Sequence, residues 1–410
     1  MQTRIPFPAR RRLAPLLAPA LLAAALGCSE DAESPTAPEA AAPAMTATAA
    51  LSFRQLSSGG NHTCAVTTDD RVYCWGDNTW GQLGDDAPGF ARLAPVRVLG
   101  GLRFRHVSAG FSHTCAVTTD DRVFCWGLNQ AGQLGDATSV SRPTPVAVAA
   151  AGRRFRQVRA GSSHTCALTP TDVAFCWGSN VYNQLGDGTT TNRPLPVRVL
   201  GGLRWSLLNG GNRHTCGVTT ANRAYCWGSN MEPEGTGGQL GDGTTIDRPR
   251  PVAVSGGLLI RQIDASIGVG HSCAVTTADR AYCWGTGFSG QLGGGTATME
   301  LVPVAVAGSR RFDHVSTGGN HTCGVTMAGR GFCWGWNGAG QVGDGTTTNR
   351  MKPVLVGDGL SFAQVSAGYI HTCALTTEGQ AYCWGKNNLG QLGDGTITDR
   401  SRPAAVAGAM

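Results

Sequence analysis

Fourteen of the fifteen cysteines form pairs whose members lie ten residues apart. The first copy reads HTCAVTTDDRVYCWG and contains His62, Cys64 and Cys74. Related stretches begin at six further histidines: His113, His164, His214, His271, His321 and His371. Such residues could bind a metal, act as reactive thiols or form disulfides. Which of these they do depends on the strands that carry them.

The spacing of ten predicts a β-hairpin in which Cys64 lies opposite Cys74, with a three-residue loop at Thr68, Asp69 and Asp70. Such loops commonly combine a type I turn with a final left-handed residue. That position holds a residue that tolerates positive φ in every copy: Asp70, Asp121, Asp172, Asn222, Asp279, Gly329 and Gly379. The turn residues therefore predict the register of the hairpin independently of the cysteines. It predicts seven disulfides: Cys64–Cys74, Cys115–Cys125, Cys166–Cys176, Cys216–Cys226, Cys273–Cys283, Cys323–Cys333 and Cys373–Cys383.

A zinc site is the main alternative for these residues, since His62, Cys64 and Cys74 offer three ligands. The His-x-Cys spacing on a strand lacks the knuckle geometry of zinc sites, and no fourth ligand repeats with it. We therefore predict no metal and no cofactor. We expect His62 and its equivalents to be structural residues that bond to a loop.

Seven repeat units provide the strands, and each reads as a propeller blade. The units start at Phe53, Phe104, Phe155, Trp205, Ile260, Phe312 and Phe362, 50 to 55 residues apart. Four short strands are expected per unit, as in 155–159 (FRQVR), 62–67, 71–76 and 95–98 (PVRV), the last beginning at a proline. Four strands, a period near 50 and no helix signal are typical of a β-propeller.

Two further repeated patterns are predicted to be structural. Tyr73 and Trp75 lie on the strand face opposite to Cys74, where they would fill the gap to a neighbouring blade. The GQLGDGT stretch lacks the lysine and helix of a phosphate loop, so it is expected to be a turn. Its aspartates are expected to pair with the following arginines, such as Arg193 and Arg248, rather than to bind calcium. They are Asp85, Asp136, Asp187, Asp242, Asp344 and Asp394, with Gly294 in the fifth unit.

The first fifty residues predict export and attachment to a membrane. Residues 1–27 combine a basic start with an apolar run too short to span a bilayer, and end in ALG before Cys28. This resembles a bacterial lipoprotein signal, in which Cys28 would receive the lipid that anchors the chain in the bilayer. The alternative is an ordinary signal peptide with an incidental cysteine. Residues 28–50 are rich in Ala, Pro, Ser and Thr and predict a disordered tether. The expected location is extracytoplasmic, at the outer membrane or cell surface rather than the inner membrane.

The distribution of charge argues against nucleic-acid binding. Four arginines before residue 28 are offset by four acids between 30 and 39, so residues 51–410 carry the whole formal charge of +6. That charge is spread over 360 residues without a basic cluster, whereas nucleic-acid binders usually concentrate Lys and Arg on one surface.

The repeats resemble those of the regulator of chromosome condensation family, with AYCWGKNNLGQLGDGTITDRSRP and VSAGYIHTCALTTEGQ as the clearest stretches. All seven units match, over nearly all of 51–410. The resemblance implies an all-β, seven-bladed β-propeller with four antiparallel strands per blade. It says less about function. Eukaryotic members include a nucleotide-exchange factor for a nuclear GTPase, other relatives bind protein partners, and a secreted bacterial relative inhibits β-lactamases. The export signal and the absence of a basic tail argue against the nuclear activity.

Loops after the first and third strands should gather on one face of the ring. Irregular aromatic and arginine residues there are the predicted partner-binding residues: Trp80, Phe111, Tyr182, Arg213, Phe288, Trp336 and Tyr369. No asymmetric set of catalytic residues departs from the repeat. We therefore expect a non-catalytic, monomeric, membrane-tethered module that binds a protein or envelope component. An inhibitor of an extracellular enzyme and a glycan-binding envelope protein are the alternatives.

Overall fold

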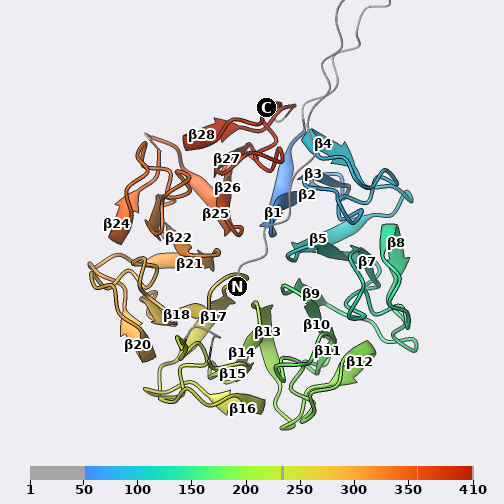
Figure 1. The fold of residues 1–410 in the computed structure, drawn as a ribbon, viewed down its shortest axis with the longest axis horizontal. Helices are drawn as coiled ribbons and strands as arrows, with labels where there is room; N and C mark the ends of the chain where they lie inside the picture. Colours follow the sequence, from blue (N-terminus) through green and yellow to red (C-terminus); the bar gives the residue numbers. More distant parts are fainter. Residues whose placement is uncertain (1–50, 232–234, 358, 409–410) are drawn as a thin grey trace, which may run out of the picture. The chain divides into compact units, whose positions relative to one another are not determined.

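The computed structural model describes residues 51–231, 235–357 and 359–408. The predicted signal peptide, Cys28 and the tether to residue 50 lie outside these residues. Seven four-stranded antiparallel sheets form a ring, as Figure 1 shows, and consecutive strands are neighbours in every sheet. The prediction of an all-β, seven-bladed propeller is confirmed.

The first strand of each blade lies nearest the centre of the ring, and the second strand pairs with it (Figure 1). The first strands are β1 (Phe53–Ser58), β5 (Phe104–Ala109), β9 (Gln157–Ala160), β13 (Trp205–Gly210), β17 (Ile260–Ala265), β21 (Phe312–Thr317) and β25 (Phe362–Ala367). The second strands are β2 (His62–Thr67), β6 (His113–Thr118), β10 (His164–Leu168), β14 (His214–Thr219), β18 (His271–Thr276), β22 (His321–Thr326) and β26 (His371–Thr376).

The third strand follows the hairpin turn, and the fourth forms the outer edge of each blade (Figure 1). The third strands are β3 (Val72–Gly76), β7 (Val123–Gly127), β11 (Ala174–Gly178), β15 (Ala224–Gly228), β19 (Ala281–Gly285), β23 (Gly331–Gly335) and β27 (Ala381–Gly385). The fourth strands are β4 (Arg92–Arg97), β8 (Arg142–Ala147), β12 (Arg193–Arg198), β16 (Arg248–Ala253), β20 (Glu300–Ala305), β24 (Arg350–Leu355) and β28 (Arg400–Ala405).

The extent of the fourth strand differs from the prediction. It was expected at 95–98, beginning at a proline, but β4 begins at Arg92 and includes Pro95. A proline can lie inside this strand because the strand is an edge, so one side of its backbone needs no hydrogen-bond donor. The first strand of the third blade is also shorter than expected, since β9 begins at Gln157 rather than at Phe155.

The hairpin between the second and third strands has the predicted register. Cys64 lies opposite Cys74 and Val66 opposite Val72. The left-handed turn position is confirmed in all seven blades, with φ between 57° and 84°. The structure joins the cysteines in the seven pairs given above, with Cα atoms 4.0–4.1 Å apart. Such closeness is typical of a non-hydrogen-bonded antiparallel pair, in which opposite side chains lie nearest to each other.

Each disulfide packs against the tryptophan of the next blade. Cys64 and Cys74 share a buried cluster with Phe104 and Trp126 of the second blade. The same arrangement closes the ring, because Trp75 of the first blade packs against the disulfide of the last, Cys373–Cys383. The predicted role of the aromatic face is confirmed. One apolar layer thus fills every gap between blades, including the gap between the two ends of the propeller.

A second layer of contacts between blades is polar, and it corrects the prediction for the histidines. His62 Nε2 bonds at 2.9 Å to Thr114 Oγ1, a hydroxyl on a strand of the next blade rather than a group of a loop. Thr114 Oγ1 donates to the carbonyl of Gln82 at 2.8 Å, so it accepts its bond from the histidine. Trp126 Nε1 donates to the same carbonyl at 2.9 Å. The repeated His, Thr, Gln and Trp therefore form one network that joins adjacent blades.

Candidate functional site

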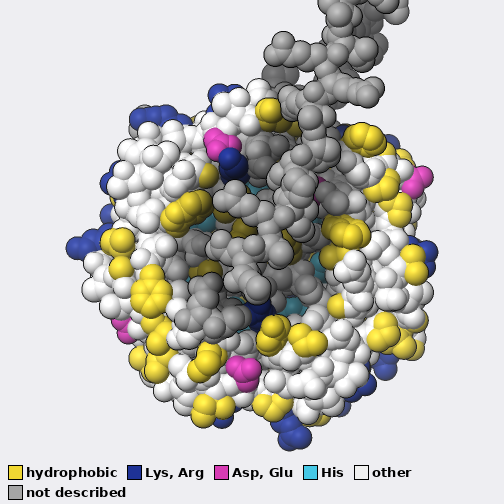
Figure 2. Space-filling model, in the orientation of Figure 1, with side chains coloured by type: hydrophobic (Ala, Val, Ile, Leu, Met, Phe, Trp, Pro, Cys, Tyr) yellow, Lys and Arg dark blue, Asp and Glu magenta, His cyan; other side chains and the backbone are white. Residues whose placement is uncertain are grey.

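The ring has two different faces because strands alternate in direction. Loops after the first and third strands of each blade lie on one side, here called the loop face. Hairpin turns and the links between blades lie on the other, the hairpin face. Figure 2 shows one face of the ring, on which hydrophobic side chains form separate patches rather than one continuous surface.

The seven predicted partner-binding residues differ in exposure. Trp80 and Phe288 are exposed, with 40% and 55% of their surfaces accessible. The other five are partly buried: Phe111, Tyr182, Arg213, Trp336 and Tyr369. They do not form a continuous aromatic rim, and several of them instead contact one another.

Phe111 and Tyr369 lie together although they come from the second and seventh blades. Their ring centroids are 5.3 Å apart at 69°, an edge-to-face contact. The turn of the first blade passes between these loops, where Gly60 donates to the carbonyl of Gly110 and Tyr369 donates to that of Gly59. A Cβ at residue 60 would lie 2.4 Å from the carbonyl oxygen of Phe111, so glycine permits this approach.

Arg213 and Tyr182 form a second pair across a blade boundary. The guanidinium carbon of Arg213 lies 4.6 Å from the centroid of the Tyr182 ring, which is a cation–π distance. This stacking orients Arg213 on the loop face beside the centre of the ring.

A cavity of about 420 Å³ lies on the loop face where the inner loops converge; we call it the mouth cavity. Its lining comes from five blades: Phe111, Ser162, Ser163, Asn212, Arg213, Thr236, Ile267, Gly268, Val269 and Tyr369. Three predicted residues, Phe111, Arg213 and Tyr369, thus meet at one site. Trp80, Tyr182, Phe288 and Trp336 are not among the residues that line it.

The fourth and fifth blades make this part of the loop face asymmetric. Five residues, 266–270, separate the first two strands of the fifth blade, whereas three do so in every other blade. In the fourth blade nineteen residues, 229–247, separate the third and fourth strands, against fourteen or fifteen elsewhere. This longer loop contacts the fifth blade, where the Gly237 amide lies 3.1 Å from Met299 Sδ.

The GQLGDGT turns have the structural role that was expected. In the third blade Asp187 Oδ2 accepts from Arg193 Nε at 2.9 Å, and Oδ1 accepts from Asn180 Nδ2 at 2.9 Å and from the Thr189 amide at 3.0 Å. Burial disfavours the ionised carboxylate, but the bonds to Thr189, Arg193 and Asn180 outweigh it, so the pKa of Asp187 is lowered. The fifth blade has Gly287, Gly294 and Glu300 in place of the Asn, Asp and Arg.

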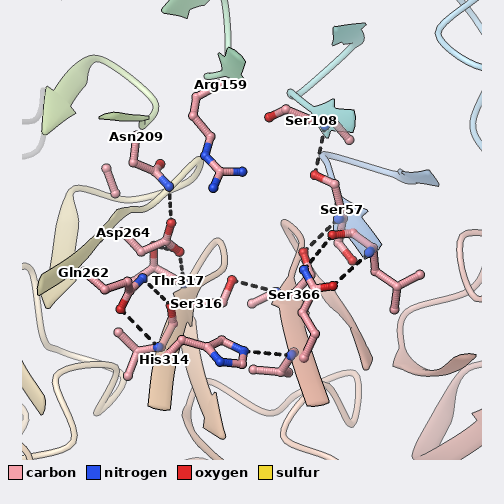
Figure 3. Close-up of a pocket in the computed structure, with 18 of the residues that line it drawn as sticks. Ser57, Ser108, Arg159, Asn209, Gln262, Asp264, His314, Ser316, Thr317 and Ser366 are labelled. Atoms are coloured by element: carbon pink, nitrogen blue, oxygen red, sulfur yellow. Dashed lines mark hydrogen bonds between the residues drawn. The ribbon is translucent and has the colours of Figure 1, made fainter. Parts of the chain in front are cut away.

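A second cavity, of about 430 Å³, occupies the centre of the ring between the first strands; we call it the channel. Arg159, Asn209 and Asp264 project into it from three consecutive blades (Figure 3). Asn209 Nδ2 donates to Asp264 Oδ1, and the Thr317 amide donates to Asp264 Oδ2 at 2.6 Å. Burial raises the pKa of Asp264 to about 6, although the bonds from Thr317 and Ser316 and the charge of Arg159 act in the other direction.

Sequence reasoning missed the channel residues and most of the mouth cavity. A signal for the channel was present, because one position of the repeat holds serine in the first, second, sixth and seventh units but Arg159, Asn209 and Asp264 in the others. The extra residues of loop 266–270 also left a sign in the sequence, because they lengthen the distance between the starts of the fifth and sixth units.

Neither cavity contains a recognisable metal site within the part of the chain that the structure describes. No helix in that part is long and apolar enough to cross a membrane.

Comparison with known proteins identifies the repeats. A family model described as an RCC1-like domain matches residues 23–323. Models of the regulator of chromosome condensation (RCC1) repeat match 362–391, 328–375 and 378–410. The ultraviolet-B receptor UVR8 of Arabidopsis thaliana is 32% identical over 275 residues, which cover 64% of this chain and 61% of the receptor. The human E3 ubiquitin-protein ligase HERC2 is 32% identical over 262 residues, 62% of this chain and 5% of the ligase.

Solved structures agree in fold. Human WBSCR16 is 22% identical with a TM-score of 0.72, and the match covers 82% of this chain and 94% of that one. Prp20p of Saccharomyces cerevisiae is 20% identical with a TM-score of 0.72, over 87% of each chain. The chain spans less than two thirds of the length of the curated relatives UVR8 and HERC2. Since the RCC1-like domain model matches well over half of its length, the chain belongs to the RCC1-like domain family.

Proposed function

We propose that this chain is a non-catalytic, membrane-tethered, extracytoplasmic propeller that binds a protein partner through its loop face. The observation that carries the proposal is the mouth cavity, where five blades contribute to one concave site. Its aromatic rings and Arg213 are residue types that commonly anchor protein interfaces. Yeast Prp20, which shares the fold, has been solved bound to Kap60, so a protein with this fold is known to bind a protein partner.

The surroundings of the mouth cavity support a protein partner. The exposed rings of Trp80 and Phe288 lie on the same face outside the cavity. The longer loops of the fourth and fifth blades make the loop face irregular, because the other blades have shorter loops at these places. A binding surface has to distinguish one partner from others, and irregular loops on a rigid scaffold are the usual way to achieve that.

The disulfides support the extracytoplasmic location. Seven buried disulfides are typical of proteins that fold in an oxidising compartment. With the lipoprotein-like segment before Cys28, they favour a chain that is exported and then anchored by a lipid.

Two measurements in cells that process lipoproteins test the tether. Palmitate labelling should tag the full chain, and the Cys28→Ser variant should lose both the label and its place in the membrane fraction. Label or membrane retention in the variant would contradict lipidation at Cys28.

Binding is tested by affinity capture from cell envelopes with the full chain as bait, followed by reconstitution with the purified partner. We expect Trp80→Ser with Phe288→Ser to weaken binding by about tenfold or more, as loss of two interface anchors would. A matched control is Met327→Ser with Leu259→Ser, which removes exposed residues from the hairpin face. Equal binding by both variants would contradict the loop-face proposal. If the partner is an enzyme, its activity with and without the propeller separates an inhibitor from a scaffold.

A further inference from the structure

The walls of the channel follow a rule that three blades break. At the equivalent position of each first strand, serine accepts a hydrogen bond from the backbone of the next blade. Ser57 Oγ accepts from the Ala109 amide at 2.9 Å, and Ser108 Oγ accepts from the Ala160 amide at 3.0 Å. Ser316 and Ser366 make the same bond, at 3.0 and 2.9 Å. In the third, fourth and fifth blades this position holds Arg159, Asn209 and Asp264.

Asp264 can replace serine in this role, but Arg159 cannot. A carboxylate accepts hydrogen bonds, and Asp264 Oδ2 takes the Thr317 amide at 2.6 Å. Arginine has only donors, so Arg159 cannot accept a backbone amide of the next blade as serine does. Its presence inside the channel therefore calls for a different explanation.

The guanidinium of Arg159 is largely without partners. Among the residues that the structure describes, it has one hydrogen-bond partner, His106 Nε2 at 3.0 Å. Its Nε is inaccessible to solvent and makes no hydrogen bond. Burial lowers the pKa of Arg159 while the charge of Asp264 acts against this. Figure 3 shows the guanidinium in the cavity, between Asn209 and Asp264 on one side and serines on the other.

The serine side of the channel offers further donors. The hydroxyls of Ser57, Ser108 and Ser366 accept from backbone amides, and no described residue accepts their hydrogens. These hydroxyls can therefore donate to a ligand. Opposite them, Asn209 and the amide and hydroxyl of Thr317 donate to Asp264, and the Ser316 side chain also bonds to it. These donors leave the carboxylate its negative charge, which can attract a cationic group.

We propose that the channel binds a small zwitterion of the amino-acid type, with its carboxylate on Arg159 and its ammonium group on Asp264. The guanidinium fork matches a carboxylate, and the serine hydroxyls extend the anionic half of the site. The two charged side chains cancel in formal charge, which suits a ligand without net charge. The volume of about 430 Å³ lies within the range of small-molecule sites. Ile267 lines both the channel and the mouth cavity, which gives the site a route to the loop face.

The test is a binding titration with the full chain by ligand-observed NMR and calorimetry. Its probes are the twenty protein amino acids in turn, with acetate and ethylammonium as ligands that carry one charge each. At least one amino acid should bind at a single saturable site, about tenfold or more tightly than acetate or ethylammonium, because it makes two charged contacts. If no amino acid binds, or if acetate binds as tightly as the best one, the proposal is wrong.

Variants that restore the serine rule locate the site without disturbing the fold. Arg159→Ser and Asp264→Ser introduce the residue that four other blades already have at this position. Each should weaken binding of the best amino acid by about tenfold or more, whereas the mouth-cavity variant Phe111→Leu should not. Unchanged binding in Arg159→Ser would place the ligand elsewhere and overturn the proposal. Circular dichroism and unfolding curves would show that both serine variants remain folded.

Discussion

His371 Nε2 donates to Thr63 Oγ1 at 2.9 Å, and this bond joins the last blade of the propeller to the first. The equivalent bonds at the six other blade boundaries are 2.8–3.1 Å long. Every blade takes its four strands from consecutive chain. The ring therefore closes without an exchanged strand, through the same side-chain contacts that join blades within the chain.

The first prediction concerns this closure. Thr63→Val removes the acceptor of His371 and the donor to the Gln391 carbonyl. It should lower the free energy of unfolding by about 1–3 kcal/mol, since the buried His371 loses its partner, while the Gln391 carbonyl keeps only its bond from Trp75 Nε1. Urea unfolding followed by tryptophan fluorescence measures this change.

Thr114→Val, at the boundary of the first and second blades, should cost a similar amount, because its bonds have the same geometry. Thr63→Ser should cost less, since serine fills this position at residue 272 in the fifth blade. A Thr63→Val protein as stable as the parent would show that the closing bond does not stabilise the ring.

The second prediction is that acid weakens the propeller below pH 6.5. Burial lowers the pKa of His62, His164 and His271 to about 4, and that of four other ring histidines to about 3. In the unfolded chain each histidine binds a proton near pH 6.5. Between pH 6.5 and 4 the unfolded state thus holds more protons. The free energy of unfolding should be highest above pH 6.5 and fall by about 1.4 kcal/mol per pH unit for each histidine.

Denaturation at pH 7.5, 6 and 5 checks this dependence. His113→Gln removes one titrating group and should reduce the slope by about one proton. A free energy of unfolding that is constant from pH 7.5 to 5 would contradict the assignment of these histidines as neutral and buried.

The third prediction concerns the disulfides. Replacement of Cys115 and Cys125 together by alanine should lower the free energy of unfolding by about 2–3 kcal/mol, the stabilisation expected from a loop of this length. The fold should persist, since six disulfides remain. Cys28→Ala is the matched control and should leave the unfolding curve unchanged. A double variant as stable as the parent would mean that the disulfides stabilise the blades little.

The fourth prediction concerns the turn between the third and fourth strands. Asp187→Ala removes the acceptor of the Thr189 amide and of Arg193 Nε, and leaves Asn180 Nδ2 with the Thr189 carbonyl, which should cost about 1–3 kcal/mol. Gly294→Asp is the informative comparison, because it restores the aspartate where the blade has Gly287 and Glu300 instead of its partners. It should bring no stabilisation. An Asp187→Ala protein as stable as the parent, or a Gly294→Asp protein more stable than the parent, would contradict the structural role of this turn.

Much of the fold could be predicted because local chemistry repeats seven times. The left-handed turn residue, exemplified by Asp70 and Gly379, sets the hairpin register and hence the partner of each cysteine. The partner of His62 could not be predicted in this way. It lies on the next blade, and the offset between adjacent blades is decided by packing rather than by local sequence.

The candidate sites were harder to predict for the same reason. Phe111 and Tyr369 are 258 positions apart in sequence and meet only because the ring closes. Arg159 and Asp264 come from different blades and share one site only because both line the channel. The break in the serine pattern marked these positions, but only the ring shows that they face one cavity.

Photo-crosslinking can decide whether the partner binds the loop face. A photoreactive amino acid would replace Phe288 on the loop face or Met327 on the hairpin face, positions with similar exposure of 55% and 59%. We expect a crosslinked protein from position 288 that is absent from position 327 and diminished by an excess of the full chain without the photoreactive residue. Crosslinks of equal yield from both positions, or from position 327 alone, would contradict binding at the loop face.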